Sequence, residues 1–151
     1  MKKTFISFLF IGSIARVAFA GDLAVPSAAT GSITVKVSNS ASTKGQFAMA
    51  LFSAPEGFPG KPEKAVRSTM IPASDPKGEI VFKNVPYGVY AISVFHDENS
   101  NGKLDTVFLL PIPKERYGSS NNPKARKGPP SFEESKFTLD RSELDMDIVL
   151  K

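Results

Sequence analysis

Residues 88–96 read Gly-Val-Tyr-Ala-Ile-Ser-Val-Phe-His and form the clearest strand pattern in the chain. One side of this stretch, taken as extended, carries Tyr90, Ile92 and Val94, and the other carries Val89, Ala91 and Phe95. Successive side chains of a β-strand point to opposite faces, and aromatic and β-branched residues favour strands. The stretch therefore predicts a strand that has apolar residues on both faces and ends at His96.

Weaker stripes with the same period of two predict further strands on either side. They lie at Ile33–Val37, Phe47–Leu51, Glu79–Val85, Phe137–Leu139 and Leu144–Leu150. The last stripe is interleaved with Glu143, Asp145 and Asp147, which predicts one buried and one solvent-facing side. Ala65–Ile71 fits a strand or a short helix equally well.

The connections favour antiparallel β-structure. Twelve prolines and eleven glycines fall mostly between the apolar stripes, and no long window has a helical period. Pro86-Tyr87-Gly88 predicts a type I turn that closes a hairpin between the two flanking strands. Six or seven short strands separated by turns predict an all-β fold, an antiparallel β-sandwich.

The first twenty residues have the pattern of a secretory signal peptide. Lys2 and Lys3 precede a short apolar run, and Ala18-Phe19-Ala20 is a cleavage sequence of the A-x-A type. We expect a signal peptide at 1–20, a flexible lead-in at 21–31 and one domain at 32–151. No later segment is long and apolar enough to span a membrane.

Charge and cysteine content narrow the class of protein. Removal of Lys2, Lys3 and Arg16 with the signal lowers the net charge from +4 to +1, which leaves little support for nucleic-acid binding. The chain has no cysteine, so an exported domain would depend on its core, with a metal ion as a further stabilising element.

Asp97-Glu98-Asn99-Ser100-Asn101-Gly102-Lys103-Leu104-Asp105 follows the predicted strand directly. Its Asp, Asn, Asn, Gly and Asp stand at relative positions 1, 3, 5, 6 and 9, as in a calcium loop of the D-x-[DN]-x-[DN]-G type. The candidate ligands are Asp97, Asn99, Asn101, the Lys103 carbonyl and Asp105. Position 12, where a bidentate Glu is expected, is Phe108, so we expect weak Ca²⁺ binding, on the order of 10⁻⁴–10⁻³ M.

The same residues fit a tight turn with no ion. Asp and Asn side chains accept hydrogen bonds from their own backbone in Asx-turns, and Asn-Gly favours positive φ. The sequence therefore leaves two interpretations of the 97–105 loop open, a calcium site and a metal-free structural turn.

His96, the only histidine, raises an enzymatic alternative. A hydrolase-type enzyme would use it as a general base, oriented by Asp97, Glu98 or a distant carboxylate. However, adjacent residues of a strand point to opposite faces, and no Ser or Cys motif supplies a nucleophile. We therefore expect no enzymatic activity and interpret His96 as a residue that braces the neighbouring loop.

A long segment at 110–131 lacks the alternating pattern of the predicted strands. It is rich in proline and carries five cations, which are Lys114, Arg116, Lys124, Arg126 and Lys127. Loops of this length are usually functional or mobile. The charges fit either contact with anionic glycan, phosphate or lipid headgroups, or a solvated loop.

Three stretches resemble the DUF2141 family of exported bacterial proteins. They are Asn84 to Asp105 with its H-D-x-N-x-N-G-x-L-D core, Pro113 to Gly118 continued at Ser120-Asn121, and Gly128-Pro129-Pro130-Ser131-Phe132. The resemblance runs from about Ile33 to the end. It implies an immunoglobulin-like or prealbumin-like β-sandwich and export, and it implies no established activity.

Together these observations predict an exported, non-enzymatic binding or structural module of the cell envelope, steadied by Ca²⁺ through residues 97–105. It would be periplasmic or extracellular, a monomer, and would bind an envelope or extracellular partner that the sequence does not identify. A hydrolase centred on His96 and a metal-free module are the alternatives.

Overall fold

The computed structural model describes residues 29–75, 78–110, 112–124 and 128–151. The predicted signal peptide at 1–20 and the lead-in up to residue 28 lie outside the described residues. The described strands are β1 (Thr30–Ser38), β2 (Gln46–Phe52), β3 (Arg67–Pro72), β4 (Glu79–Pro86), β5 (Gly88–Asp97), β6 (Tyr117–Ser119), β7 (Phe137–Leu139) and β8 (Glu143–Val149). Two short helices, η1 (Pro62–Lys64) and α1 (Phe132–Ser135), complete the described elements.

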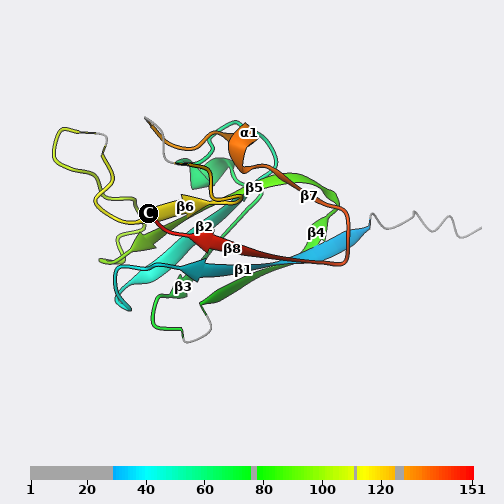
Figure 1. Ribbon diagram of the computed structural model, residues 1–151, viewed down its shortest axis with the longest axis horizontal. Coiled ribbons are helices and arrows are strands. Elements are labelled where there is room, and N and C mark those ends of the chain that lie inside the picture. Colours follow the sequence, from blue (N-terminus) through cyan, green and yellow to red (C-terminus); the bar gives the residue numbers. More distant parts are fainter. Residues whose placement is uncertain (1–28, 76–77, 111, 125–127) are drawn as a thin grey trace, which may run out of the picture.

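The strands form two sheets (Figure 1). The smaller sheet has the order β4-β1-β8, and the larger has the order β3-β2-β5-β6, with β7 paired to the first residues of β5. All these pairs are antiparallel except β1 with β8, which run parallel. The prediction of an all-β fold with mostly antiparallel sheets is confirmed.

The main core lies between the two sheets. It is lined by the inward residues of both, chiefly Ile33, Val35, Phe47, Met49, Leu51, Ile80, Phe82, Tyr90, Ile92, Val94, Leu139, Ile148 and Leu150. These residues include most of the apolar stripes that the sequence pattern placed on one face of each strand. Val37, Phe137, Leu144 and Met146 of those stripes are partly buried and pack against this core. A smaller cluster of Ala50, Phe52, Ala91 and Phe132 lies on the outer face of the larger sheet, under α1. Consequently β5 is buried on both faces over part of its length, as its two apolar stripes predicted.

The predicted hairpin at Pro86-Tyr87-Gly88 is wrong. β4 pairs with β1, whereas β5 pairs with β2, so the turn carries the chain from one sheet to the other. The Tyr87 N–H donates to Ala29 O and the Tyr90 hydroxyl donates to Pro86 O, and both bonds hold this corner. Pro and Gly mark the change of direction, but they do not determine which strands pair.

Three elements of the described chain, η1, β6 and α1, have no counterpart in the sequence prediction. β6 lies within the segment at 110–131 and pairs with Ser93–Phe95 of β5, and α1 follows it. Ala65–Ile71, which fitted a strand or a helix, contributes to β3 after η1. At four residues or fewer, neither described helix has the length that a membrane span requires.

Candidate metal centre at the end of β5

The end of β5 places His96 and Asp97 at the centre of the candidate site. Pairing with β2 sets His96 opposite Phe47 and Asp97 opposite Gln46. Both side chains are fully buried, although their neighbours in the chain, Glu98 onward, are exposed. The strand therefore ends in two buried polar residues, and each must find its partners within the fold.

Asp97 organises the loop that follows it. Its carboxylate accepts hydrogen bonds from the Gln46 side-chain amide (2.9 Å) and from the backbone N–H groups of Asn101 (3.0 Å) and Gly102 (2.8 Å). Burial alone raises the pKa of this carboxyl, but these bonds, with one from Ser100 N–H, outweigh it and hold the pKa below its usual value. Asp97 is thus a buried carboxylate that remains ionised at neutral pH.

Side chains from the rest of the loop meet at Asp105. The Nδ2 groups of Asn99 and Asn101 donate to the two carboxylate oxygens of Asp105, at 2.8 and 3.1 Å. The Oδ1 atoms of the same asparagines accept from Asn101 N–H and Lys103 N–H, two residues further on in each case. Ser100 and Gly102 have φ of 58° and 75°, so the loop needs residues that tolerate the left-handed region.

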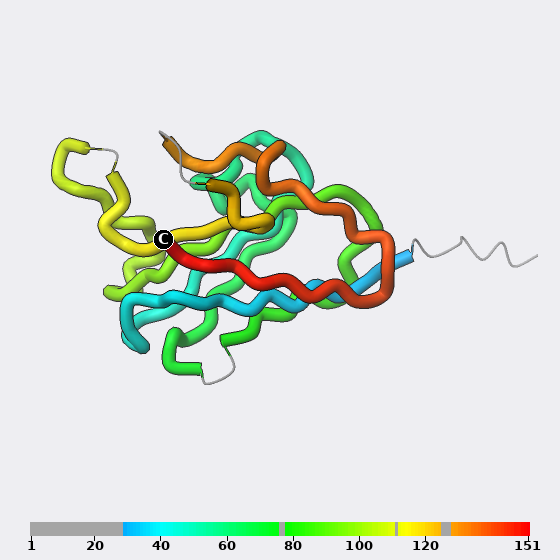
Figure 2. Tube along the Cα trace, in the orientation of Figure 1, coloured from blue at the N-terminus to red at the C-terminus, as the bar shows by residue number. Residues whose placement is uncertain are grey.

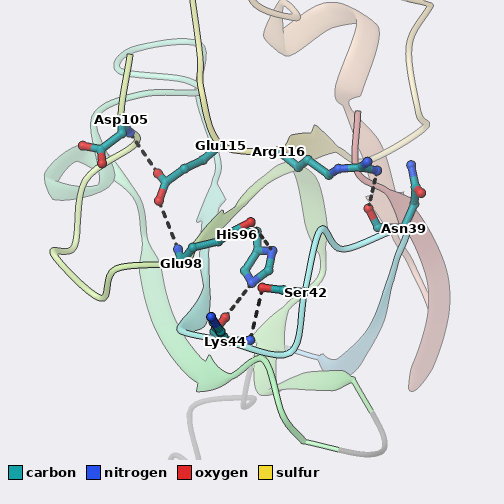
Figure 3. A network of polar contacts seen from close by, with 8 residues as sticks. All are labelled: Asn39, Ser42, Lys44, His96, Glu98, Asp105, Glu115 and Arg116. Carbon is teal, nitrogen blue, oxygen red and sulfur yellow. Dashed lines mark hydrogen bonds and ion pairs between the residues drawn. The ribbon is translucent and has the colours of Figure 1, made fainter. Parts of the chain in front are cut away.

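Glu115 closes the loop from outside it (Figure 3). Its two carboxylate oxygens accept the backbone N–H of Glu98 at 3.0 Å and that of Asp105 at 2.9 Å. Beyond it, Lys114 N–H donates to Asp105 O, and Thr106 forms an isolated bridge with Pro113. Both ends of the 97–105 loop are therefore attached to one carboxylate of the segment that returns to β6.

His96 braces the loop before β2. Its Nε2 lies 2.7 Å from the carbonyl oxygen of Lys44 (Figure 3). Its ring packs against that of Phe47 with centroids 5.1 Å apart. Since a carbonyl can only accept, Nε2 must carry the hydrogen that is donated in this bond. Nδ1 is buried without a hydrogen bond and lies 3.8 Å from Glu98 Oε1.

The structure brings together four of the five predicted ligands by their side chains. Asp97, Asn99, Asn101 and Asp105 form one hydrogen-bonded loop, and Lys103 contributes its backbone to it. Within the described ranges, no group of three or more His, Cys, Asp or Glu residues is placed to hold a metal ion. The five candidate ligands would offer two carboxylates and neutral oxygens. Such a donor set suits a hard cation that is bound weakly. Binding would require the Asn99 and Asn101 amides to turn their oxygens inward in place of their Nδ2 groups.

Three residues that support the site were not identified from the sequence. They are Lys44, Gln46 and Glu115, which lie between 10 and 52 positions away from the atoms that they bind. No local pattern marks them, because each contact is created by the pairing of β2 with β5 or by the return of the chain towards β6.

The family comparison agrees with the resemblance noted in the sequence. The family model described as an uncharacterized protein conserved in bacteria (DUF2141) matches residues 35–147, which contain the whole loop and its supporting residues. Searches of curated proteins and of solved structures gave no match.

Proposed function

Because the chain belongs to the DUF2141 family, we propose that it is an exported, non-enzymatic binding or structural module of the bacterial cell envelope, steadied by Ca²⁺ at the 97–105 loop. The ligands are the side chains of Asp97, Asn99, Asn101 and Asp105 with the Lys103 carbonyl. The finer fold assignment, an immunoglobulin-like or prealbumin-like sandwich, belongs to this proposal and is supported by the two packed, mostly antiparallel sheets.

One observation carries the calcium assignment. The ionised carboxylate of Asp97 and the carboxylate of Asp105 are parts of the same nine-residue loop. Asp97 accepts backbone N–H groups of this loop, and Asp105 accepts the side-chain amides of Asn99 and Asn101. Ca²⁺ needs six to eight oxygens at about 2.3–2.6 Å, and flexible loops supply them from side chains, carbonyls and water. With two formal charges in the set, we expect a Kd on the order of 10⁻⁴–10⁻³ M, suited to a compartment outside the cytoplasm.

Export is proposed from the signal-peptide pattern of the first twenty residues. The destination is the periplasm or the extracellular medium. A bound cation there would tie the end of β5 to the returning segment and stabilise a domain that has no disulfide.

A binding role is supported by the outer face of the larger sheet. A groove of about 1440 Å³ runs between this face and the flanking loops, with Phe58, Met70, Phe95, Leu104 and Ile112 among its walls. Most of its surface is apolar, as is usual for sites that bind ligands or peptide segments. Leu104 and Thr106, which flank the last residue of the 97–105 loop, line this groove. Ordering of that loop by an ion would therefore also fix one wall of the groove.

The burial of His96 favours the non-enzymatic interpretation. A general base must reach a proton of its substrate, but the His96 ring is fully buried, and its Nε2 is engaged by Lys44 O. Neither this groove nor the smaller hollow beside β6 includes His96 in its lining. A hydrolase centred on His96 is therefore less well supported than a binding module.

One observation favours a metal-free structural turn as the second candidate. The Asn99 and Asn101 amides already pair with Asp105, and both Asx-turns form without an ion. A loop whose side chains are satisfied in this way has less to gain from a cation.

Thermal melting with calcium and with chelator tests the proposal. We expect the melting temperature of Gly21–Lys151 to rise saturably with millimolar calcium, and Asp97→Ala and Asp105→Asn to remove the rise. Asp145→Asn, an exposed change on β8, is the matched control and should respond to calcium like the wild type. An equal loss of stability by Asp97→Ala with and without calcium would favour the metal-free turn.

A further inference from the structure

The segment between β5 and β6 carries the most exposed cluster of large apolar side chains in the described chain. Phe108 is 82% exposed, Leu109 85%, Leu110 51% and Ile112 53%. We call these four residues the apolar finger. It projects beyond both sheets as the yellow loop at the upper left of Figure 2. Large exposed apolar patches in a soluble domain mark surfaces that bind a partner.

Hydrogen bonds shape the finger and reduce the cost of moving it out of water. Val107 N–H donates to Ile112 O at 2.8 Å, and Leu110 N–H donates to Val107 O at 2.9 Å. Pro113, which follows the tip, has no N–H group by its chemistry. Since an unpaired N–H is costly in an apolar medium, each of these two bonds lowers the cost of burying part of the tip in one.

Two exposed lysines flank the base of the finger. Lys103 precedes it and Lys114 follows it, next to the bridge between Thr106 and Pro113. Neither lysine has an ion-pair partner within the part of the chain that the structure describes. The nearby carboxylates of Asp105 and Glu115 are engaged instead by N–H groups of the 97–105 loop. The two ammonium groups are therefore free to meet anions beside the apolar tip.

From these observations we propose that the apolar finger docks the domain on bilayers that contain anionic phospholipid. Phe108, Leu109, Leu110 and Ile112 enter the boundary between headgroups and acyl chains, and Lys103 and Lys114 contact the headgroup phosphates. A projecting tip with outward side chains offers little area to a flat protein surface, whereas a bilayer can close around it. Apolar contact combined with attraction to anionic lipid is the usual basis of interfacial binding.

This inference names the envelope partner of the function proposed above and takes only the cellular location from it. The hydrogen bonds of the finger do not use the predicted calcium ligands' side chains. The test is therefore made in chelator with purified protein and vesicles. A failure to bind calcium then leaves the finger untouched, and a failure to bind vesicles leaves the calcium site untouched.

A single introduced tryptophan gives the sharpest readout, because the chain has none. We expect the emission of Phe108→Trp to shift to the blue with vesicles of phosphatidylcholine and phosphatidylglycerol, and to be quenched by lipids labelled on their acyl chains. Val81→Trp is the matched control, since Val81 is an exposed apolar residue on β4 of the other sheet. Its emission should stay unchanged. Equal responses of the two variants, or no response of Phe108→Trp, would overturn the proposal.

Sedimentation with the same vesicles tests the finger without a reporter. The double change Phe108→Ser with Leu109→Ser should weaken binding by at least about tenfold, because each removes an apolar side chain from the lipid contact. Lys103→Gln with Lys114→Gln should weaken binding and reduce its dependence on salt. Undiminished binding by the serine variant would contradict the proposal. So would a dimer that the serine variant abolishes in the absence of vesicle binding, which would assign the finger to a second copy of the chain.

Discussion

The Glu115 carboxylate accepts the backbone N–H of Asp105 at 2.9 Å, so a residue of the segment that returns to β6 fixes the far end of the candidate calcium loop. The second oxygen of Glu115 accepts Glu98 N–H, which is at the near end of the same loop. The loop is thus closed by one carboxylate that is not among the candidate ligands. Its shape therefore depends on a residue that lies 10 positions beyond its last residue.

Glu115→Gln is expected to loosen the loop. The amide retains one acceptor and places an NH₂ group where the second acceptor was, so one of the two N–H groups loses its partner. We expect a loss of about 1–2 kcal/mol in the free energy of unfolding, measured by urea denaturation, and faster hydrogen exchange at the amides of Glu98 and Asp105. Glu143→Gln, an exposed change on β8, is the control. If the two variants are equally stable, Glu115 does not hold the loop.

Asp97 should make stability depend on pH in the acid range. Its folded-state pKa lies below the usual value, so in acid the unfolded chain binds a proton more readily than the folded chain does. The stability that Asp97 contributes is therefore complete above the unfolded value, about 3.9. It is lost as pH falls from there through the folded pKa.

The variant Asp97→Asn isolates this contribution. At pH 7 it should be less stable than the wild type by about 1–3 kcal/mol, and the difference should shrink as the pH of the urea titrations is lowered below about 4. Asp145→Asn, with its side chain exposed on β8, should change stability little at either pH. A difference between wild type and Asp97→Asn that does not change with pH would show that the ionised form of Asp97 is not what stabilises the loop.

Gly45→Ala tests the close approach of the preceding loop to the site. Gly45 has φ of 69°, and a Cβ built on it would lie 2.0 Å from the Asp97 carbonyl oxygen, which is main chain and cannot rotate away. We expect this change to destabilise the fold by at least about 2 kcal/mol, the sum of backbone strain and displaced packing. Gly60→Ala is the control because nothing lies within 4 Å of its Cβ position. The melting temperatures of the two variants should therefore differ clearly. Similar melting temperatures would mean that the loop before β2 rearranges without loss of stability.

The strands were predictable where alternation runs over several residues. β8 shows this best, because Glu143, Asp145 and Asp147 are exposed while Ile148, and Leu150 just after the strand, are buried. A period of two needs only neighbouring positions, so it can be recognised in sequence. β6 has three residues, which is too few for any period, and its place beside β5 is set by pairing.

Pairing between distant segments accounts for what the sequence did not predict. The turn at Pro86-Tyr87-Gly88 was recognised, but its two strands belong to different sheets. Likewise, Ser119 and Ser120 in a polar run are buried, because Ser120 Oγ accepts Ile92 N–H and donates to Ser135 O. The spacing in the 97–105 loop identified the residues that come together there. It did not identify Gln46 or Glu115, which hold them from other elements.

Isothermal titration of Asn101→Asp with calcium, beside the wild type, tests the central claim most directly. The added carboxylate gives the loop a third formal charge, which should strengthen calcium binding by about tenfold if position 101 is a ligand. Without an ion the same change replaces the Nδ2 bond to Asp105 with repulsion between two carboxylates. The account predicts tighter binding and a lower melting temperature in chelator that calcium restores. A melting temperature lowered equally with and without calcium, and no heat of binding in either protein, would contradict it and leave a metal-free turn.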